Sequence, residues 1–224
     1  MPQPNEKKVK VVIVEDHPMF RERLAELINR EPDLEVCGEA DNIRDGFDLI
    51  TRGGAEVAIL DITLQGSSGL ELLKNIKAAG VELPVLVLSM HDESLYAERV
   101  LRAGAKGYIT KSEASAKIMT ALRQVLAGEI YLSAKMATKL LGQLAGGSEA
   151  ATGLDRLTDR ELEVFHLIGS GQTTREISAS LGLGAATVET YRARIKEKLQ
   201  LENGARLQHE ALRWVQANER RAAV

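Results

Sequence analysis

Five short apolar runs alternate with amphipathic segments between residues 9 and 126, and this alternation restricts the fold more than any other feature. The runs are VKVVIV (9–14), LEVCGEA (34–40), EVAIL (56–60), PVLVLS (84–89) and KGYIT (106–110). The segments that follow them carry apolar residues at the three- and four-residue spacing of helices: 21–29, 43–50, 70–78, 94–101 and 115–126. Strands apolar on both faces that alternate with helices predict an α/β doubly wound fold with a five-stranded parallel sheet.

Polar residues stand where these predicted strands end. Glu15 and Asp16 follow the first strand, Asp61 follows the third, Ser89 ends the fourth and Lys111 follows the fifth. Because ligands of doubly wound sheets bind at the carboxyl ends of the strands, we expect these five side chains to gather at one edge.

The chemistry of this predicted cluster follows from its charges. Three carboxylates repel one another unless a cation neutralises them, and a ligand set of oxygen atoms favours Mg²⁺. Lys111 and Ser89 offer a positive charge and a hydroxyl donor for the oxygens of a transferred phosphoryl group. Asp61, central to the set, is the natural nucleophile, so the sequence predicts that it is phosphorylated.

Four segments resemble the receiver domain of bacterial response regulators of the NarL/FixJ type, which has a flavodoxin-like sheet: VVIVEDHPMFRERL, AILDITLQGSSGLELL, VLVLSMHDE and VLRAGAKGYITKS. The resemblance implies that Glu15 and Asp16 bind the metal and that Asp61 is the phosphoacceptor. It also implies that the backbone carbonyl of Thr63 is a further Mg²⁺ ligand.

The same resemblance assigns the readout of phosphorylation. Ser89 and Lys111 would sense the phosphoryl group, and Tyr108 would be the aromatic switch, whose ring moves inward once Ser89 turns toward that group. Two residues depart from the family pattern, because Gln65 and Ser112 stand where many receivers have proline.

Other readings of the first domain are less favoured. A haloacid-dehalogenase-type phosphatase needs a second Asp two residues after its nucleophile, where this chain has Thr63, so we do not expect an enzyme. We interpret His17 and His91 as polar loop residues, because neither has a second His or Cys at ligand spacing. The single cysteine, Cys37, is interpreted as a packing residue of its strand.

The composition is that of a cytoplasmic protein. The net charge is -3, 44% of the residues are hydrophobic, and no apolar run approaches the roughly 20 residues of a membrane-spanning helix. The acidic excess lies in the first part of the chain. A generally basic nucleic-acid-binding protein is therefore excluded, and only a local basic surface remains possible.

The last third of the chain predicts a small all-α domain of four helices. Thr158 with Glu161 and Thr173 with Glu176 have the spacing of capping boxes, so two helix starts are marked. We expect Gly169 and Gly171 to end the first of these helices, Gly182 and Gly184 to end the second, and the third to span 185–199. Two helices joined by a short glycine-containing turn suggest a helix-turn-helix, although another small helical bundle would show the same spacing. The expected domains are 1–133 and 157–224, with a partly helical linker at 134–156.

The segments LTDRELEVFHLIGSG and TTREISASLGLGAATVETYRARIKEKL resemble the LuxR-type DNA-binding domain. Tyr191 stands where the family often has His, Glu189 where it often has a basic residue, and Gly184 where it often has a capping Ser, so the base preference is not transferable. On a helical wheel, Val188, Ile195 and Leu199 share an inward line. The residues expected at DNA are Thr187, Glu189, Thr190, Tyr191, Arg192, Ala193, Arg194, Lys196 and Lys198.

Together these features predict a two-component response regulator. A sensor histidine kinase would phosphorylate Asp61, and the phosphorylated chain would bind promoter DNA, with a homodimer forming on phosphorylation or on DNA. The apolar stripe of the last helix either dimerises or only packs the small domain: Leu207, Ala211, Leu212 and Val215. The alternative function is a phosphorylation-dependent protein-protein adaptor whose second domain does not read DNA.

Overall fold

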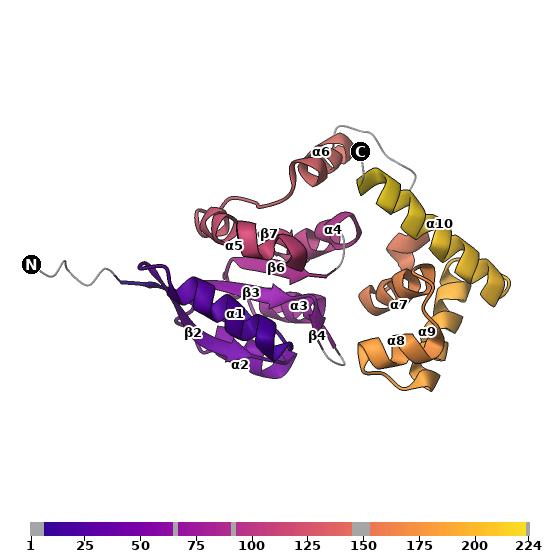
Figure 1. Ribbon diagram of the computed structural model, residues 1–224, viewed down its shortest axis with the longest axis horizontal. Coiled ribbons are helices and arrows are strands. Elements are labelled where there is room, and N and C mark those ends of the chain that lie inside the picture. The colour runs from indigo at the N-terminus through magenta and orange to yellow at the C-terminus, as the bar shows by residue number, and fades with distance from the viewer. Residues whose placement is uncertain (1–6, 65–66, 91–92, 145–152, 223–224) are drawn as a thin grey trace, which may run out of the picture. The chain divides into compact units, whose positions relative to one another are not determined.

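A computed structural model describes residues 7–64, 67–90, 93–144 and 153–222 of the chain (Figure 1). It divides into two compact units that meet in sequence near Gly142, and each unit is a separate fold.

The first unit is built on a five-stranded parallel sheet. Its strands are β1 (Val9–Val14), β2 (Leu34–Ala40), β3 (Val57–Asp61), β6 (Val85–Ser89) and β7 (Gly107–Thr110), and they lie side by side in the order β2-β1-β3-β6-β7. A short antiparallel pair, β4 (Thr63–Leu64) and β5 (Ser67–Ser68), follows β3. The predicted doubly wound sheet is confirmed.

Helices cover both faces of this sheet (Figure 1). They are α1 (Pro18–Asn29), α2 (Ile43–Thr51), α3 (Gly69–Ala78), α4 (Glu93–Ala103) and α5 (Lys111–Leu126). Ile28 of α1 and Leu122 of α5 belong to one buried cluster with Ile13 and Ile59 of the sheet. On the other face α2 packs so closely that a Cβ atom at Gly46 would lie 2.9 Å from Cγ2 of Val14.

The interpretation of Cys37 as a packing residue of its strand, β2, is wrong. Cys37 is exposed and is not a packing residue. Strand β2 lies at the edge of the sheet, and its pairing with β1 shifts from Val36 to Gly38, which leaves Cys37 without a paired residue. An alternation of strands and helices does not by itself reveal which strand lies at the edge.

The opposite edge of the sheet, β7, is covered by the chain that leaves α5. The backbone N–H of Tyr108 donates to the carbonyl of Tyr131 at 3.0 Å, and the N–H of Tyr131 donates to Lys106 at 2.9 Å. The N–H of Ser133 then donates to Oε1 of Glu93, the first residue of α4, at 2.8 Å. Helix α6 (Ala134–Leu144) follows, so the helical part of the predicted linker begins tied to the first unit.

The second unit is all-helical. It contains a short 3-10 helix, η1 (Gly153–Arg156), and the helices α7 (Asp159–Gly169), α8 (Thr174–Leu181), α9 (Ala185–Lys198) and α10 (Gly204–Ala222). Both predicted capping boxes are present, at Thr158 with Glu161 and at Thr173 with Glu176. Helix α8 ends at Gly182, whose φ of 63° is the left-handed conformation that glycine adopts readily.

Gly169 is the last residue of α7, and Gly171 just beyond it has a φ of 83°, so both glycines stand at the helix end as predicted. Gly169 has a second role that was not predicted, because a Cβ atom there would lie 2.4 Å from the carbonyl oxygen of Ala211 in α10. The glycine is therefore required for close packing of two helices. Leu207 and Ala211 are fully buried and Val215 is nearly so, which leaves Leu212 as the exposed member of the apolar stripe. The structure thus favours core packing for this stripe.

None of the helices in the described ranges combines the length and the apolar character that crossing a membrane requires.

Candidate functional site

The carboxyl ends of the strands bring the predicted acidic and basic residues together. Asp61 ends β3, Glu15 follows β1, and both carboxylates are buried. Ser89 ends β6 and is fully buried. Lys111 follows β7 directly as the first residue of α5. The parallel register places these chain positions at one edge of the sheet, as the sequence predicts.

Lys111 joins the two buried carboxylates. Its Nζ atom lies 2.8 Å from Oδ2 of Asp61 and 2.8 Å from Oε2 of Glu15. The same ammonium group lies 4.9 Å from the centroid of the Phe20 ring, which adds a cation–π contact. One cation therefore compensates two carboxylates that would otherwise repel each other.

The protonation of Asp61 is set by its surroundings. Burial, together with the charge of Glu15, raises the pKa of Asp61 to about 6, although Lys111 and the N–H of Thr63 favour the charged form. That N–H donates to Oδ1 of Asp61 at 3.1 Å. Burial alone would lower the pKa of Lys111, but the attraction of Asp61 and Glu15 outweighs it and raises the pKa. The lysine therefore remains charged, and Asp61 depends on cations to remain ionised.

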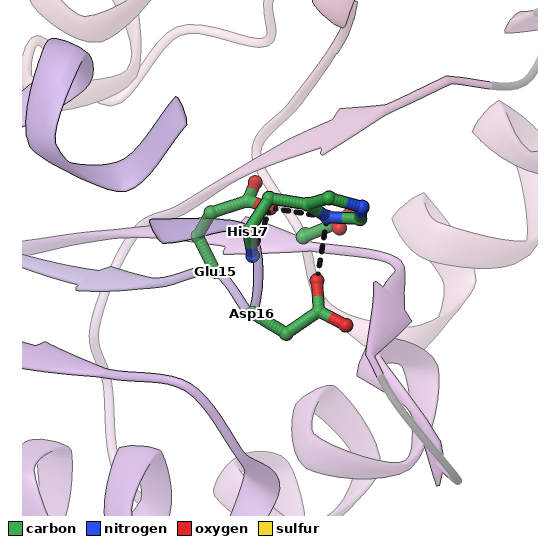
Figure 2. Close-up of side chains that lie close together, drawn as sticks. Glu15, Asp16 and His17 are labelled. Carbon is green, nitrogen blue, oxygen red and sulfur yellow. Dashed lines mark hydrogen bonds and ion pairs between the residues drawn. The ribbon is translucent and has the colours of Figure 1, made fainter. Parts of the chain in front are cut away.

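His17 lies against the acidic pair, as Figure 2 shows. Its Nδ1 atom lies 2.8 Å from Oδ1 of Asp16 and 3.2 Å from Oε1 of Glu15. Potential ligand atoms of Glu15, Asp16, His17 and Asp61 all lie within 4.8 Å of one another. The three carboxylates fit a hard divalent cation such as Mg²⁺, which prefers oxygen ligands. His17 was interpreted as a polar loop residue, and its contacts with Asp16 and Glu15 were not predicted. His91, like Gln65, lies outside the described residues.

Tyr108 lies on β7 and is buried, with 1% of the residue exposed. Its role as the aromatic switch stays a prediction.

Sequence reasoning missed two residues that shape this site. A Cβ atom at Gly69 would lie 2.1 Å from the carbonyl oxygen of Asp61, so only glycine lets α3 begin this close to Asp61. Phe20 lies under Lys111. The run of small residues after Asp61 was the only sequence signal for the close approach, and no signal pointed to Phe20.

In the second unit, α9 places the predicted inward line toward the core, with Leu199 half-buried, and exposes the opposite side. Val188 and Ile195 are fully buried, whereas the central outward residues are exposed: Ala186, Thr187, Glu189, Thr190, Ala193 and Arg194. Tyr191, Arg192 and Lys196 are half-buried beside this face.

Lys198, one of the residues predicted to contact DNA, has a partner inside the second unit. Its Nζ atom lies 2.6 Å from Oε2 of Glu161, a buried carboxylate in the first turn of α7. Burial would raise the pKa of Glu161, but hydrogen bonds from Lys198 and Thr158 outweigh it and lower the pKa. The ammonium group of Lys198 therefore binds an inner carboxylate of the domain, and its contact with DNA stays a prediction.

Glu189 is engaged by a neighbouring helix. The hydroxyl of Thr174, the first residue of α8, donates to Oε1 of Glu189 at 2.7 Å. The Nε atom of Arg192 lies 3.6 Å from the same oxygen. This exposed carboxylate is therefore held in one orientation.

An α/β unit with a buried acidic edge, followed by a helix-turn-helix unit, is the architecture of a phosphorylation-controlled transcription regulator. The model of the response regulator receiver domain matches residues 11–123, and that of the bacterial regulatory proteins of the luxR family matches residues 155–211.

The whole chain has similar relatives among characterised proteins. The transcriptional regulatory protein UhpA of Salmonella typhimurium is 34% identical over 201 residues, which cover 90% of this chain and 96% of that protein. The transcriptional regulatory protein LiaR of Bacillus subtilis is also 34% identical, over 87% of this chain and 92% of its own length.

Solved structures agree with the fold. A two-component response regulator of the LuxR family from Aurantimonas sp. SI85-9A1 superimposes with a TM-score of 0.57 at 29% identity, covering 62% of this chain and 99% of that one. RcsB from Salmonella enterica serovar Typhimurium, bound to the promoter P1flhDC, gives a TM-score of 0.59 at 24% identity over 92% of this chain and 98% of its own. The present chain belongs to the NarL/FixJ-type response regulators, which join a receiver domain to a LuxR-type DNA-binding domain and regulate transcription.

Proposed function

We propose that a sensor histidine kinase phosphorylates this regulator on Asp61 and that the phosphorylated chain binds promoter DNA through α9. The observation that carries the proposal is the buried Asp61 carboxylate at the end of β3, beside Glu15 and within 2.8 Å of Lys111. A carboxylate can act as the nucleophile, and the nearby positive charge stabilises the negative charge of the transferred phosphoryl group.

The reaction is a transfer between two side chains. An oxygen of ionised Asp61 forms a bond to phosphorus as the bond from phosphorus to the kinase histidine nitrogen breaks, and the nitrogen keeps the electron pair. Lys111 and the N–H of Thr63 already contact the Asp61 carboxylate, so they hold it in place. Glu15, Asp16, Asp61 and the carbonyl of Thr63 would hold Mg²⁺, which neutralises the charge on the phosphoryl oxygens.

The DNA-binding part of the proposal is supported by the exposed face of α9. Small residues at its centre, Ala186 and Ala193, permit close approach to a major groove, and Arg194 is exposed beside them. Half-buried Arg192 and Lys196 supply further positive charge for phosphates. One structural relative is a complex of two RcsB dimers bound to two parallel DNAs. We propose that this chain also acts as a homodimer on DNA. We further propose that it acts in the cytoplasm.

Labelling with acetyl phosphate and Mg²⁺ tests the phosphoacceptor. We expect one phosphoryl group per wild-type chain, measured by intact mass, and none on Asp61→Asn. Asp41→Asn is the matched control, because Asp41 is an exposed aspartate of the same unit. Equal labelling of wild type and Asp61→Asn would refute the assignment.

Selection of genomic DNA by the phosphorylated chain tests the second part. Enrichment of a shared sequence supports promoter recognition. Retention of no DNA would favour the adaptor function instead.

A further inference from the structure

Two adjacent threonines at the start of α8, the N-cap Thr173 and the first helical residue Thr174, have different partners. The hydroxyl of Thr173 serves the capping box of α8 with Glu176. The hydroxyl of Thr174 is directed to the next helix and donates to Oε1 of Glu189 at 2.7 Å. Thr174 thus links the helix before the turn to the exposed face of α9.

Both contacts of Glu189 use the same carboxylate oxygen. Thr174 and the Nε atom of Arg192 approach Oε1, while in the described part of the chain Oε2 receives no hydrogen bond. The Glu189 side chain is 59% exposed, so Oε2 remains accessible on the outward face of α9.

We propose that Thr174 is a positioning residue that orients Glu189 to read a base that carries an amino group. This inference rests on the proposed binding of DNA by α9. An ionised carboxylate only accepts hydrogen bonds, and the major groove presents amino donors at cytosine N4 and adenine N6. Glutamate pairs with cytosine N4, so cytosine is the expected base, whereas guanine and thymine present acceptor oxygens that repel a carboxylate.

The glutamate side chain has several rotatable bonds, and fixing it in one conformation when DNA binds costs free energy. The hydrogen bond from Thr174 holds Glu189 before DNA binds, so this cost is reduced. Arg192 adds a second benefit, because its charge offsets the repulsion between Glu189 and the DNA phosphates.

The test measures base discrimination by the full chain. Affinities are determined for a selected DNA site and for its single-base variants, with wild type, Glu189→Ala, Thr174→Val and the double variant. We expect Glu189→Ala to lose about 5- to 150-fold discrimination at one base pair. Thr174→Val should lose several-fold discrimination at that same base pair, and the double variant should be no worse than Glu189→Ala.

Two controls separate positioning from general damage. Thr174→Ser retains a hydroxyl and should retain discrimination. Ser180→Ala removes an exposed hydroxyl of the same helix, whose partner is Gln172, and should leave discrimination unchanged. Folding of each variant is checked by the fluorescence of Trp214 in this unit.

The inference is overturned if Thr174→Val weakens binding equally for all four bases, or if it changes preference at a base pair other than the one that depends on Glu189. It is also overturned if Glu189→Ala leaves base preference intact while wild type binds selectively. Absence of selective binding by wild type would instead refute the proposed DNA function itself, and with it this inference.

Discussion

The Nζ atom of Lys198 lies 2.6 Å from Oε2 of Glu161, which joins the last turn of α9 to the first turn of α7. Glu161 also accepts the N–H of Thr158 at 2.7 Å, so one buried carboxylate caps α7 and anchors α9. The contact predicts that the second unit depends on Lys198 for stability.

Lys198→Met is expected to lower the free energy of unfolding of the second unit by about 1–3 kcal/mol, because the buried Glu161 carboxylate keeps the Thr158 N–H but loses its charged donor. Trp214 is the single tryptophan and packs on Phe165 with ring centroids 5.6 Å apart, so its fluorescence reports this unit within the full chain. Lys196→Met on the same helix is the control. Equal urea midpoints for both variants would contradict the role of Lys198.

The pKa of Glu161 gives a pH dependence. Because the folded state lowers this pKa, the stabilisation is fully present above the unfolded pKa of about 4.3 and is lost as pH falls through the folded value. The stability difference between wild type and Lys198→Met should therefore be largest near neutral pH and shrink below about pH 4. Carboxyl chemical shifts should also show a higher pKa for Glu161 in Lys198→Met. An identical pKa in the two proteins would contradict the coupling.

Gly169→Ala should destabilise the second unit, because its Cβ atom would lie 2.4 Å from the Ala211 carbonyl and 2.6 Å from Cγ2 of Val215. We expect a loss of about 1–3 kcal/mol or more from forced separation of α7 and α10. Gly204→Ala, with no atom within 4 Å of the new Cβ, is the control and should change stability by less than about 1 kcal/mol. Thermal unfolding followed at Trp214 measures both, and similar melting temperatures would exclude the close-packing role.

The contrast between Gly169 and Gly182 shows why part of the structure could be predicted from the sequence and part could not. Apolar spacing revealed the strands and helices, and parallel strand ends located Asp61 beside Glu15 and Lys111. Both glycines stand at a helix end, however, and the sequence does not reveal that Gly169 also admits a neighbouring helix whereas Gly182 adopts the left-handed conformation.

Contacts between distant segments were similarly hidden. Lys198 lies on the basic part of α9 in any helical wheel, but its partner Glu161 is 37 residues away and is found only when the helices are packed. Cys37 is exposed on an edge strand where the pairing shifts, and local alternation encodes neither the strand order nor the shift.

Ser89→Ala should separate phosphorylation from its readout. Ser89 is fully buried at the end of β6, and we expect its hydroxyl to turn toward a phosphoryl group on Asp61. Labelling by acetyl phosphate should remain, while the increase in DNA affinity on phosphorylation should fall about tenfold or more, since a hydrogen bond to a charged group contributes about 1.5–3 kcal/mol. Ser112→Ala, an exposed hydroxyl bonded to Thr110, is the control. An unchanged DNA response in Ser89→Ala would remove Ser89 from the switch.

Arg194 and Lys198 are both basic residues of α9, and the structure predicts opposite outcomes for their removal. Arg194 is exposed on the outward side, so Arg194→Ala should weaken binding to all DNA sequences and reduce the slope of log affinity against log salt by about 0.9, the contribution of one phosphate contact. The Lys198 ammonium group binds Glu161, so Lys198→Met should leave the slope unchanged under conditions in which the domain remains folded. Binding titrations of the full chain at several salt concentrations measure both slopes. If the salt slope falls equally in both variants, Lys198 contacts the DNA backbone. If the slope does not change in Arg194→Ala, Arg194 does not contact phosphate.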